Sequence, residues 1–162
     1  MIFVSVGANP HPFDRLIKEV DRLVSEKKIK DEFIVQLGNT NYYSKNIKKV
    51  KKFWKENEYK KILRSCNLII THAGLGNVMV GMEHNKPLIV VPRRKEFGEH
   101  VDNHQMEMAK YIEKSESCLV IHDINDLESS IKKMVKIKIK LKKRVEPEIL
   151  NIIKNLVKSI LE

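Results

Sequence analysis

The segment from Leu68 to Pro92 decides the fold of this chain. It reads Leu68-Ile69-Ile70-Thr71, then His72-Ala73-Gly74-Leu75-Gly76-Asn77, and after a helical stretch Lys86-Pro87-Leu88-Ile89-Val90-Val91-Pro92. Two apolar runs without polar alternation are typical of strands that are buried on both faces. The 14 residues between Thr71 and Lys86 suffice for a crossover through one helix. The segment therefore predicts a βαβ unit with parallel strands.

The turn after the first of these strands has the features of a phosphate site. Gly74 and Gly76 let the backbone approach a ligand closely, and the following helix N-terminus offers free N–H groups that favour a diphosphate. In an open parallel sheet this turn lies at the carboxyl ends of the strands, where ligands bind. Two glycines also occur in ordinary tight turns, so the motif alone leaves both interpretations open. Position 79, the place of a third glycine, is Met, and no Walker motif is present, which argues against an ATPase or an ordinary dinucleotide enzyme.

Length and composition predict one α/β domain over residues 1–162, with a Rossmann-like parallel sheet flanked by helices. The chain is too short for two Rossmann-sized lobes, so a cleft between two lobes would need a partner chain. Cys66 and Cys118 suggest neither a zinc site nor a disulfide framework, and we expect reduced cytosolic thiols. Residues 1–7 are typical of a first strand rather than a signal peptide. No stretch approaches the ~20 apolar residues of a membrane span, so we expect membrane contact to be peripheral.

The apolar periodicity predicts the remaining elements. Strands are expected at residues 2–6, 33–37, 50–54 and 118–121, and helices at 13–24, 58–64 and 106–112, with another starting near Leu127. Asp123 or Asn125 is the expected cap of that last helix. In the loop after residue 38, Tyr42 and Tyr43 are expected to be half-buried cover, with stacking on a base or sugar as the alternative.

The positive charge is concentrated near the end of the chain. The net charge is +10, and residues 132–144 hold eight cationic residues and no acidic one. The tract suits a solvated linker or an anionic membrane surface, whereas nucleic acid is disfavoured because no aromatic stacking platform accompanies it. Residues 147–161 predict an amphipathic helix with more apolar surface than a peripheral helix requires, which indicates an interface.

The loop after Pro92 is the most polar part of the central region. His100 and His104 are four residues apart, a spacing that suits either a metal pair on one helix face or hydrogen bonds to hydroxyl groups. Hydrogen bonding is favoured because no third ligand stands at a useful spacing, and the amides of Asn103 and Gln105 also suit hydroxyls. The loop therefore points to a sugar.

Together these motifs resemble a known family. His72-Ala73-Gly74-x-Gly76, Lys86-Pro87-Leu88-Ile89-Val90-Val91-Pro92 and Asn103-His104-Gln105, in this order, resemble the donor-binding half of GT-B glycosyltransferases related to the bacterial lipid II N-acetylglucosaminyltransferase. The start, Val4-Ser5-Val6-Gly7, and the stretch Pro92 to Val101 look more narrowly like short subunits of split glycosyltransferases in capsule and exopolysaccharide synthesis. Those subunits are similar to the catalytic subunit of the eukaryotic enzyme that adds the second GlcNAc to dolichol-linked precursors.

The resemblance implies a single lobe of a GT-B fold, active only with a membrane-anchored subunit that binds a lipid-diphosphate-linked acceptor. The implied enzyme is an inverting, metal-independent hexosyltransferase that uses a UDP-sugar and no cofactor, at the inner face of the cell membrane. The implied donor-binding residues are Gly7, His72, Gly74, Gly76, Asn77, Glu83, Arg93, Asn103, His104 and Gln105. No general base is identified; it belongs either to the partner or to His11, the local candidate.

Three positions depart from the family pattern. Asn77 stands in place of the usual Thr, Asn85 in place of Gly, and Val80 in place of a Glu that binds the ribose. Val cannot accept hydrogen bonds from ribose hydroxyls, which favours an alternative reading as a non-catalytic assembly subunit with a degenerate donor site. Glu83 lies one helical turn further and is the candidate to replace the missing carboxylate.

Overall fold

A computed structural model of the chain describes residues 1–115 and 118–137. Its six strands are β1 (Ile2–Ser5), β2 (Phe33–Gln36), β3 (Lys49–Lys51), β4 (Leu68–Thr71), β5 (Leu88–Val90) and β6 (Cys118–Val120). They form one sheet in the order β3-β2-β1-β4-β5-β6, and every neighbouring pair is parallel. This is the strand order of a Rossmann-like doubly wound sheet, as the sequence predicted.

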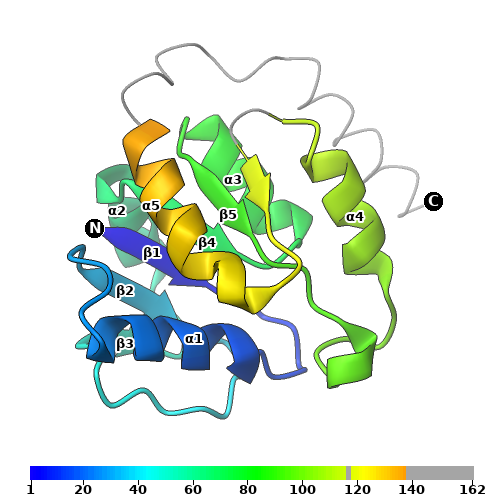
Figure 1. Cartoon of the computed structure of the whole chain (residues 1–162), viewed down its shortest axis with the longest axis horizontal. Helices are drawn as coiled ribbons and strands as arrows, with labels where there is room; N and C mark the ends of the chain where they lie inside the picture. Colours follow the sequence, from blue (N-terminus) through cyan, green and yellow to red (C-terminus); the bar gives the residue numbers. More distant parts are fainter. Residues whose placement is uncertain (116–117, 138–162) are drawn as a thin grey trace.

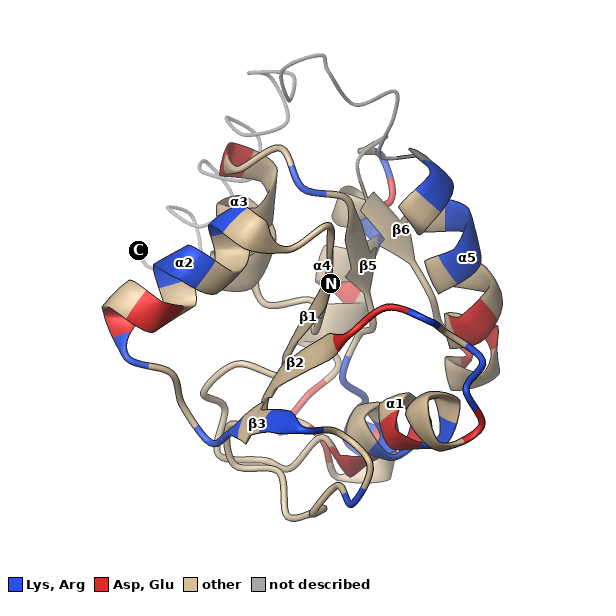
Figure 2. Ribbon diagram, turned by 90° about the vertical axis from the view of Figure 1, so that its left-hand side faces the viewer, with Lys and Arg blue, Asp and Glu red and all other residues tan. Residues whose placement is uncertain are grey.

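Helices cover both faces of the sheet. The five α-helices are α1 (Asp14–Ser25), α2 (Glu56–Ser65), α3 (Leu75–Glu83), α4 (His104–Ile112) and α5 (Leu127–Ile137). Figure 1 shows α1 and α5 in front of the sheet, and the rotated view in Figure 2 shows α2 and α3 on the opposite side of the strands. None of the helices in the described part of the chain is long and apolar enough to cross a membrane.

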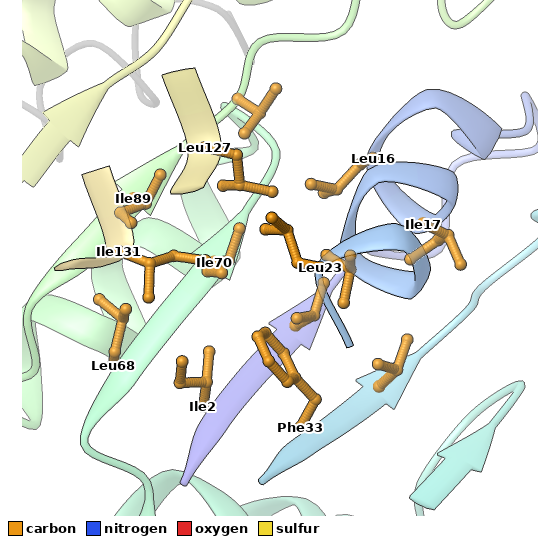
Figure 3. Packing of buried hydrophobic residues seen from close by; sticks show 14 of the residues in the cluster. Ile2, Leu16, Ile17, Leu23, Phe33, Leu68, Ile70, Ile89, Leu127 and Ile131 are labelled. Carbon is orange, nitrogen blue, oxygen red and sulfur yellow. The ribbon is translucent and has the colours of Figure 1, made fainter. Parts of the chain in front are cut away.

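Alternating side chains of the strands divide the core into two clusters. Ile2 and Val4 of β1 belong to the cluster under α1 and α5, whereas Phe3 belongs to the one under α2, α3 and α4. Figure 3 shows Leu16 of α1 and Leu127 of α5 meeting the strand side chains of the first cluster. Both faces of the central strands are therefore sealed, which explains their unbroken apolar sequences.

The strand order reverses at β1 and β4. From β1, one half of the sheet continues through β2 to β3, and the other half continues through β4 to β6. Ligands of doubly wound sheets bind at such a switch point, outside the carboxyl ends of the strands. Gly7 follows β1 there and His72 follows β4, so the topology brings these two candidate residues to one place.

The main differences from the predicted elements lie at the edges. β3 is Lys49–Lys51 rather than 50–54, α2 begins at Glu56 rather than residue 58, and α4 begins at His104 rather than residue 106. Residues 132–137 of the basic tract belong to α5, so the tract begins as a helix and not as a linker. The rest of that tract and the predicted helix 147–161 lie outside the described residues.

Candidate functional site

The imidazole of His72 lies between two glycines at the switch point. A β-carbon at Gly7 or at Gly74 would collide with the His72 ring. Gly7 also has a φ of 74°, a backbone conformation that favours glycine. His72 is buried, and this burial, together with the charge of Arg93, lowers its pKa from 6.5 to about 4. His72 is therefore neutral at pH 7 and shapes the turn without contributing charge.

Helix α3 starts at this turn with open space at Gly76, its second residue. Its N-cap is Gly74, so no side chain caps the first turn. A β-carbon at Gly76 would meet nothing within 4 Å. Uncapped N–H groups and the helix dipole favour an anion in such a place. Gly81 lets α3 pack closely against β5, because a β-carbon at this position would collide with Leu88.

Asn77 fixes α3 to the strands below it. Its Nδ2 donates to Ser5 Oγ at 3.0 Å and to Thr71 Oγ1 at 2.9 Å, and its Oδ1 accepts from the Tyr59 hydroxyl at 3.2 Å. Gln36 Nε2 reaches the same Ser5 hydroxyl at 3.4 Å. The Asn77 amide, which the resemblance assigned to the donor, is thus engaged in positioning the turn.

Arg93 is completely buried and ties two loops to the sheet. Its Nη1 donates to the carbonyls of His11 and Glu99 at 2.8 and 3.0 Å, and its Nη2 donates to Val6 at 2.8 Å. Burial lowers its pKa to about 10, which still leaves it charged at pH 7. The guanidinium holds the loop after β1 against the loop after β5.

Glu99 anchors the loop after β5 from its buried side. Its carboxylate receives two hydrogen bonds from Arg15, at 2.8 and 2.9 Å, and one from the Arg94 N–H at 3.0 Å. Arg15 also donates to the Pro92 carbonyl at 3.0 Å. A bidentate pair of this kind is geometrically specific, so the loop is fixed in place before any ligand binds.

The three polar residues at the start of α4 have separate surroundings. Gln105 is buried, and its Oε1 accepts from the Arg93 N–H at 3.1 Å. Asn103 is exposed and accepts from the Lys95 N–H at 3.2 Å, while His104 Nδ1 lies 3.8 Å from Glu107. Of these, Asn103 and His104 remain accessible to a ligand, and Gln105 supports the loop from below.

The metal alternative for His100 and His104 does not match the geometry. His100 precedes the first residue of α4, so the two histidines do not share one helix face. Within the part of the chain that the structure describes, no group of three or more His, Cys, Asp or Glu side chains is placed to hold a metal ion.

The other departures from the family pattern fall on α3 and its end. Asn85 has a φ of 50°, a conformation that glycine prefers and asparagine tolerates, so its replacement of Gly keeps the turn. Val80 is partly buried against the cluster under α3, and Glu83 is exposed at the last residue of the helix. The helix therefore offers a carboxylate one turn beyond Val80.

Several residues that build this site carried no sequence signal. Ser5 and Thr71 end apolar strands, and the sequence shows them only as polar residues at the carboxyl edge of the sheet.

Tyr42 packs as cover, as predicted, because its hydroxyl donates to Asp21 at 2.8 Å. The prediction of half-buried cover is wrong for Tyr43, which is 80% exposed.

A doubly wound sheet with an uncapped, glycine-lined helix N-terminus at its switch point defines a nucleotide-binding type of lobe. The family described as "Glycosyltransferase family 28 C-terminal domain" matches residues 1–160. The chain belongs to this family, and it is a GT-B C-terminal, donor-binding lobe.

Individual relatives support this assignment. The human "UDP-N-acetylglucosamine transferase subunit ALG13" is 31% identical over 126 residues, which cover 70% of this chain and 10% of the human protein. The Candida albicans subunit of the same name is 37% identical over 71 residues, 44% of this chain and 22% of that protein. The chain thus spans less than a quarter of the length of these relatives.

Solved structures share the fold. The glycosyltransferase of kitacinnamycin gives a TM-score of 0.56 at 15% identity, covering 96% of this chain and 37% of that one. The solution structure of ALG13 gives 0.51 at 21% identity, covering 89% of this chain and 87% of that one. In the first comparison the fold of this chain matches about a third of the larger protein.

Proposed function

We propose that the chain is the donor-binding subunit of a split hexosyltransferase that takes its sugar from a UDP-sugar. The observation that carries this proposal is the open, uncapped N-terminus of α3 beside the His72 ring. Its N–H groups would hold the diphosphate, and the neutral ring leaves the helix terminus as the source of positive potential. UDP-GlcNAc is the first donor to test, because the relatives carry the name of UDP-N-acetylglucosamine transferase subunits.

The proposed reaction is an inverting, metal-independent displacement. A hydroxyl of a lipid-diphosphate-linked acceptor attacks the anomeric carbon of the donor, and UDP departs from the opposite side. The α3 N-terminus would stabilise the charge that develops on the departing diphosphate, since fixed N–H dipoles are effective where charge appears in the transition state.

The proposed partner is a membrane-anchored subunit that supplies the acceptor-binding lobe, in capsular or exopolysaccharide synthesis. We place the complex in the cytoplasm, at the inner face of the cell membrane. Lys132, Lys133 and Lys136 of α5 are exposed, and Figure 2 shows basic residues along this helix. Each such charge near anionic lipid is worth about 1 kcal/mol. We assign assembly with the partner to residues 147–161.

The test separates donor binding from turnover. The single chain is expected to bind UDP in a calorimetric titration, and to transfer no sugar until the partner subunit is added, because orientation of both reactants supplies ~7–11 kcal/mol of the barrier reduction. Deleting residues 146–162 should reduce transfer by the pair more than UDP binding by the single chain. Full turnover by the single chain on a lipid-linked acceptor would refute the split enzyme.

A non-catalytic assembly subunit is the second candidate, favoured by Val80 in the place of a ribose-binding Glu. It predicts a chain that binds the partner and stabilises it but gives no heat with UDP or UDP-GlcNAc. The same titration therefore decides between the two candidates.

A further inference from the structure

His100 and Asp102 form a histidine–carboxylate pair in the loop after β5. His100 Nδ1 lies 2.9 Å from Asp102 Oδ1, and the same Oδ1 accepts from the His104 N–H at 2.9 Å. The hydrogen bond from the His104 N–H lowers the pKa of Asp102, although some burial opposes it, and the charge of His100 lowers it further. The Asp102 N–H also approaches His100 Nδ1, at 3.3 Å, but the contact with the carboxylate is shorter. With the proton on Nδ1 that contact is a charge-assisted hydrogen bond, so the carboxylate favours this tautomer and leaves the lone pair on Nε2.

The loop presents this pair at the switch point. Arg93 binds the Glu99 carbonyl, directly before His100, with the same guanidinium that binds the carbonyl of Val6, directly before Gly7. Arg15 holds the Glu99 side chain on the buried side of the loop. His100 thus stands on a backbone that is fixed to the rim of the glycine turn.

The charged and titratable neighbours of His100 come from three segments. Its ring centroid lies 6.5 Å from that of His11 in the loop after β1, and His100, when protonated, would lower the pKa of the buried His72 ring after β4. Asp102 completes the set from the same loop. Neighbouring Val101 is 64% exposed, whereas the His100 side chain is 16% exposed, so the ring is mostly covered and does not extend into solvent.

We propose that His100 is the general base of the transfer reaction and that Asp102 is the residue that positions it. This inference rests on the proposed function. His100 Nε2 takes the proton of the acceptor hydroxyl as the oxygen forms its bond to the anomeric carbon. The bond between that carbon and the β-phosphate oxygen breaks, and UDP leaves with the electron pair. The proton on His100 then passes to solvent, which restores the neutral ring.

Four variants test the assignment in the complex of the full chain with its partner in membranes, with radiolabelled UDP-GlcNAc as donor. His100→Ala should lower kcat about 100-fold or more and leave KM and the UDP dissociation constant within about twofold of wild type. Added imidazole should restore part of the rate in this variant. His100→Gln, in which the side chain has a similar size but cannot take up a proton, should be equally slow. Asp102→Asn should lower kcat less and should not respond to imidazole.

His122→Ala is the matched control, because His122 Nε2 and Glu113 form another pair of this kind at 2.8 Å on the surface. It should keep the wild-type rate. A His100→Ala complex that turns over like wild type, or a loss that appears only in His11→Ala, would overturn the base assignment and leave donor binding intact. Absence of UDP binding and of transfer in the wild-type complex would instead overturn the proposed function, and this inference with it.

Discussion

The His72 ring fills the place beside Gly74 in which a β-carbon would have to lie. The turn that faces the proposed diphosphate is therefore shaped by packing against a neutral, buried ring. A buried cationic ring would have bound an anion more strongly, but it would have had to be desolvated in every unliganded molecule. The helix terminus provides a permanent dipole without that cost.

Gly74→Ala is expected to destabilise the chain by about 1–3 kcal/mol, because the added methyl group collides with a buried ring. Urea unfolding measures the effect. His72→Ala in the same background should recover part of the loss, since it removes the group that the methyl meets. Equal losses in the two backgrounds would show that the collision is not the cause.

Gly76→Val separates ligand binding from folding at the same turn. A side chain at Gly76 meets nothing within 4 Å, so the melting temperature should stay close to that of wild type. The valine side chain would occupy the approach to the α3 N–H groups, and we expect UDP binding to fall below detection in calorimetry. A folded Gly76→Val chain with wild-type affinity would exclude the α3 terminus as the diphosphate site.

The depressed pKa of His72 makes stability depend on pH. The unfolded chain binds a proton at this side chain below pH 6.5, whereas the folded chain resists it until about pH 4. The free energy of unfolding should therefore fall as the pH is lowered through this window, by about 2 kcal/mol between pH 7 and pH 5.

The matched variant is His72→Gln, which has no titrating ring. Its unfolding free energy should vary less across this pH window, even if it is lower throughout. Asp21 does not interfere, because its pKa is held below 3.8: burial raises it, but hydrogen bonds led by that of Ser44 outweigh the burial. If the unfolding free energies of wild type and His72→Gln had the same pH dependence, the dependence would not come from the His72 ring.

The central half of the sheet was predictable because its signals are local. β1 and β4 are short apolar runs bounded by turn formers, and the glycines that follow them mark the close approaches that the structure contains. β3 was misplaced because an exposed edge strand has no buried face to impose a pattern.

The supports of the site were not predictable, because their partners are distant in sequence. Arg93 binds carbonyls that lie 81 to 87 residues earlier, and Arg15 pairs with Glu99 across 84 residues. A cationic residue in a polar loop looks like a ligand contact until the fold shows what surrounds it. The resemblance named Arg93 among the donor-binding residues, and in the structure its guanidinium binds backbone carbonyls of the two loops.

Val80→Glu tests whether the pocket otherwise follows the family pattern. The new carboxylate would accept hydrogen bonds from the ribose hydroxyls. In a calorimetric titration the binding free energy of UDP should become more favourable by about 1–3 kcal/mol. Glu83→Gln in the wild-type background is the companion variant. If Glu83 already serves the ribose, that variant should weaken UDP binding and Val80→Glu should add little; no change in either would favour the assembly subunit.

Arg93→Lys should disrupt the scaffold while keeping its charge. Lysine has one ammonium group, which cannot reach the carbonyls of Val6, His11 and Glu99 together. We expect a loss of about 2–4 kcal/mol in unfolding free energy by urea denaturation, with faster hydrogen exchange in residues 7–12 and 94–103. Because these loops hold Gly7 and His100, transfer by the complex should fall with them. Arg94→Lys is the control, since the Arg94 side chain makes surface contacts: its Nη2 donates to the exposed His122 carbonyl at 2.7 Å, and its guanidinium lies near Glu96 and the Phe97 ring. Its loss should stay within about 1 kcal/mol. Wild-type stability and exchange in Arg93→Lys would show that the buried guanidinium does not hold the two loops together.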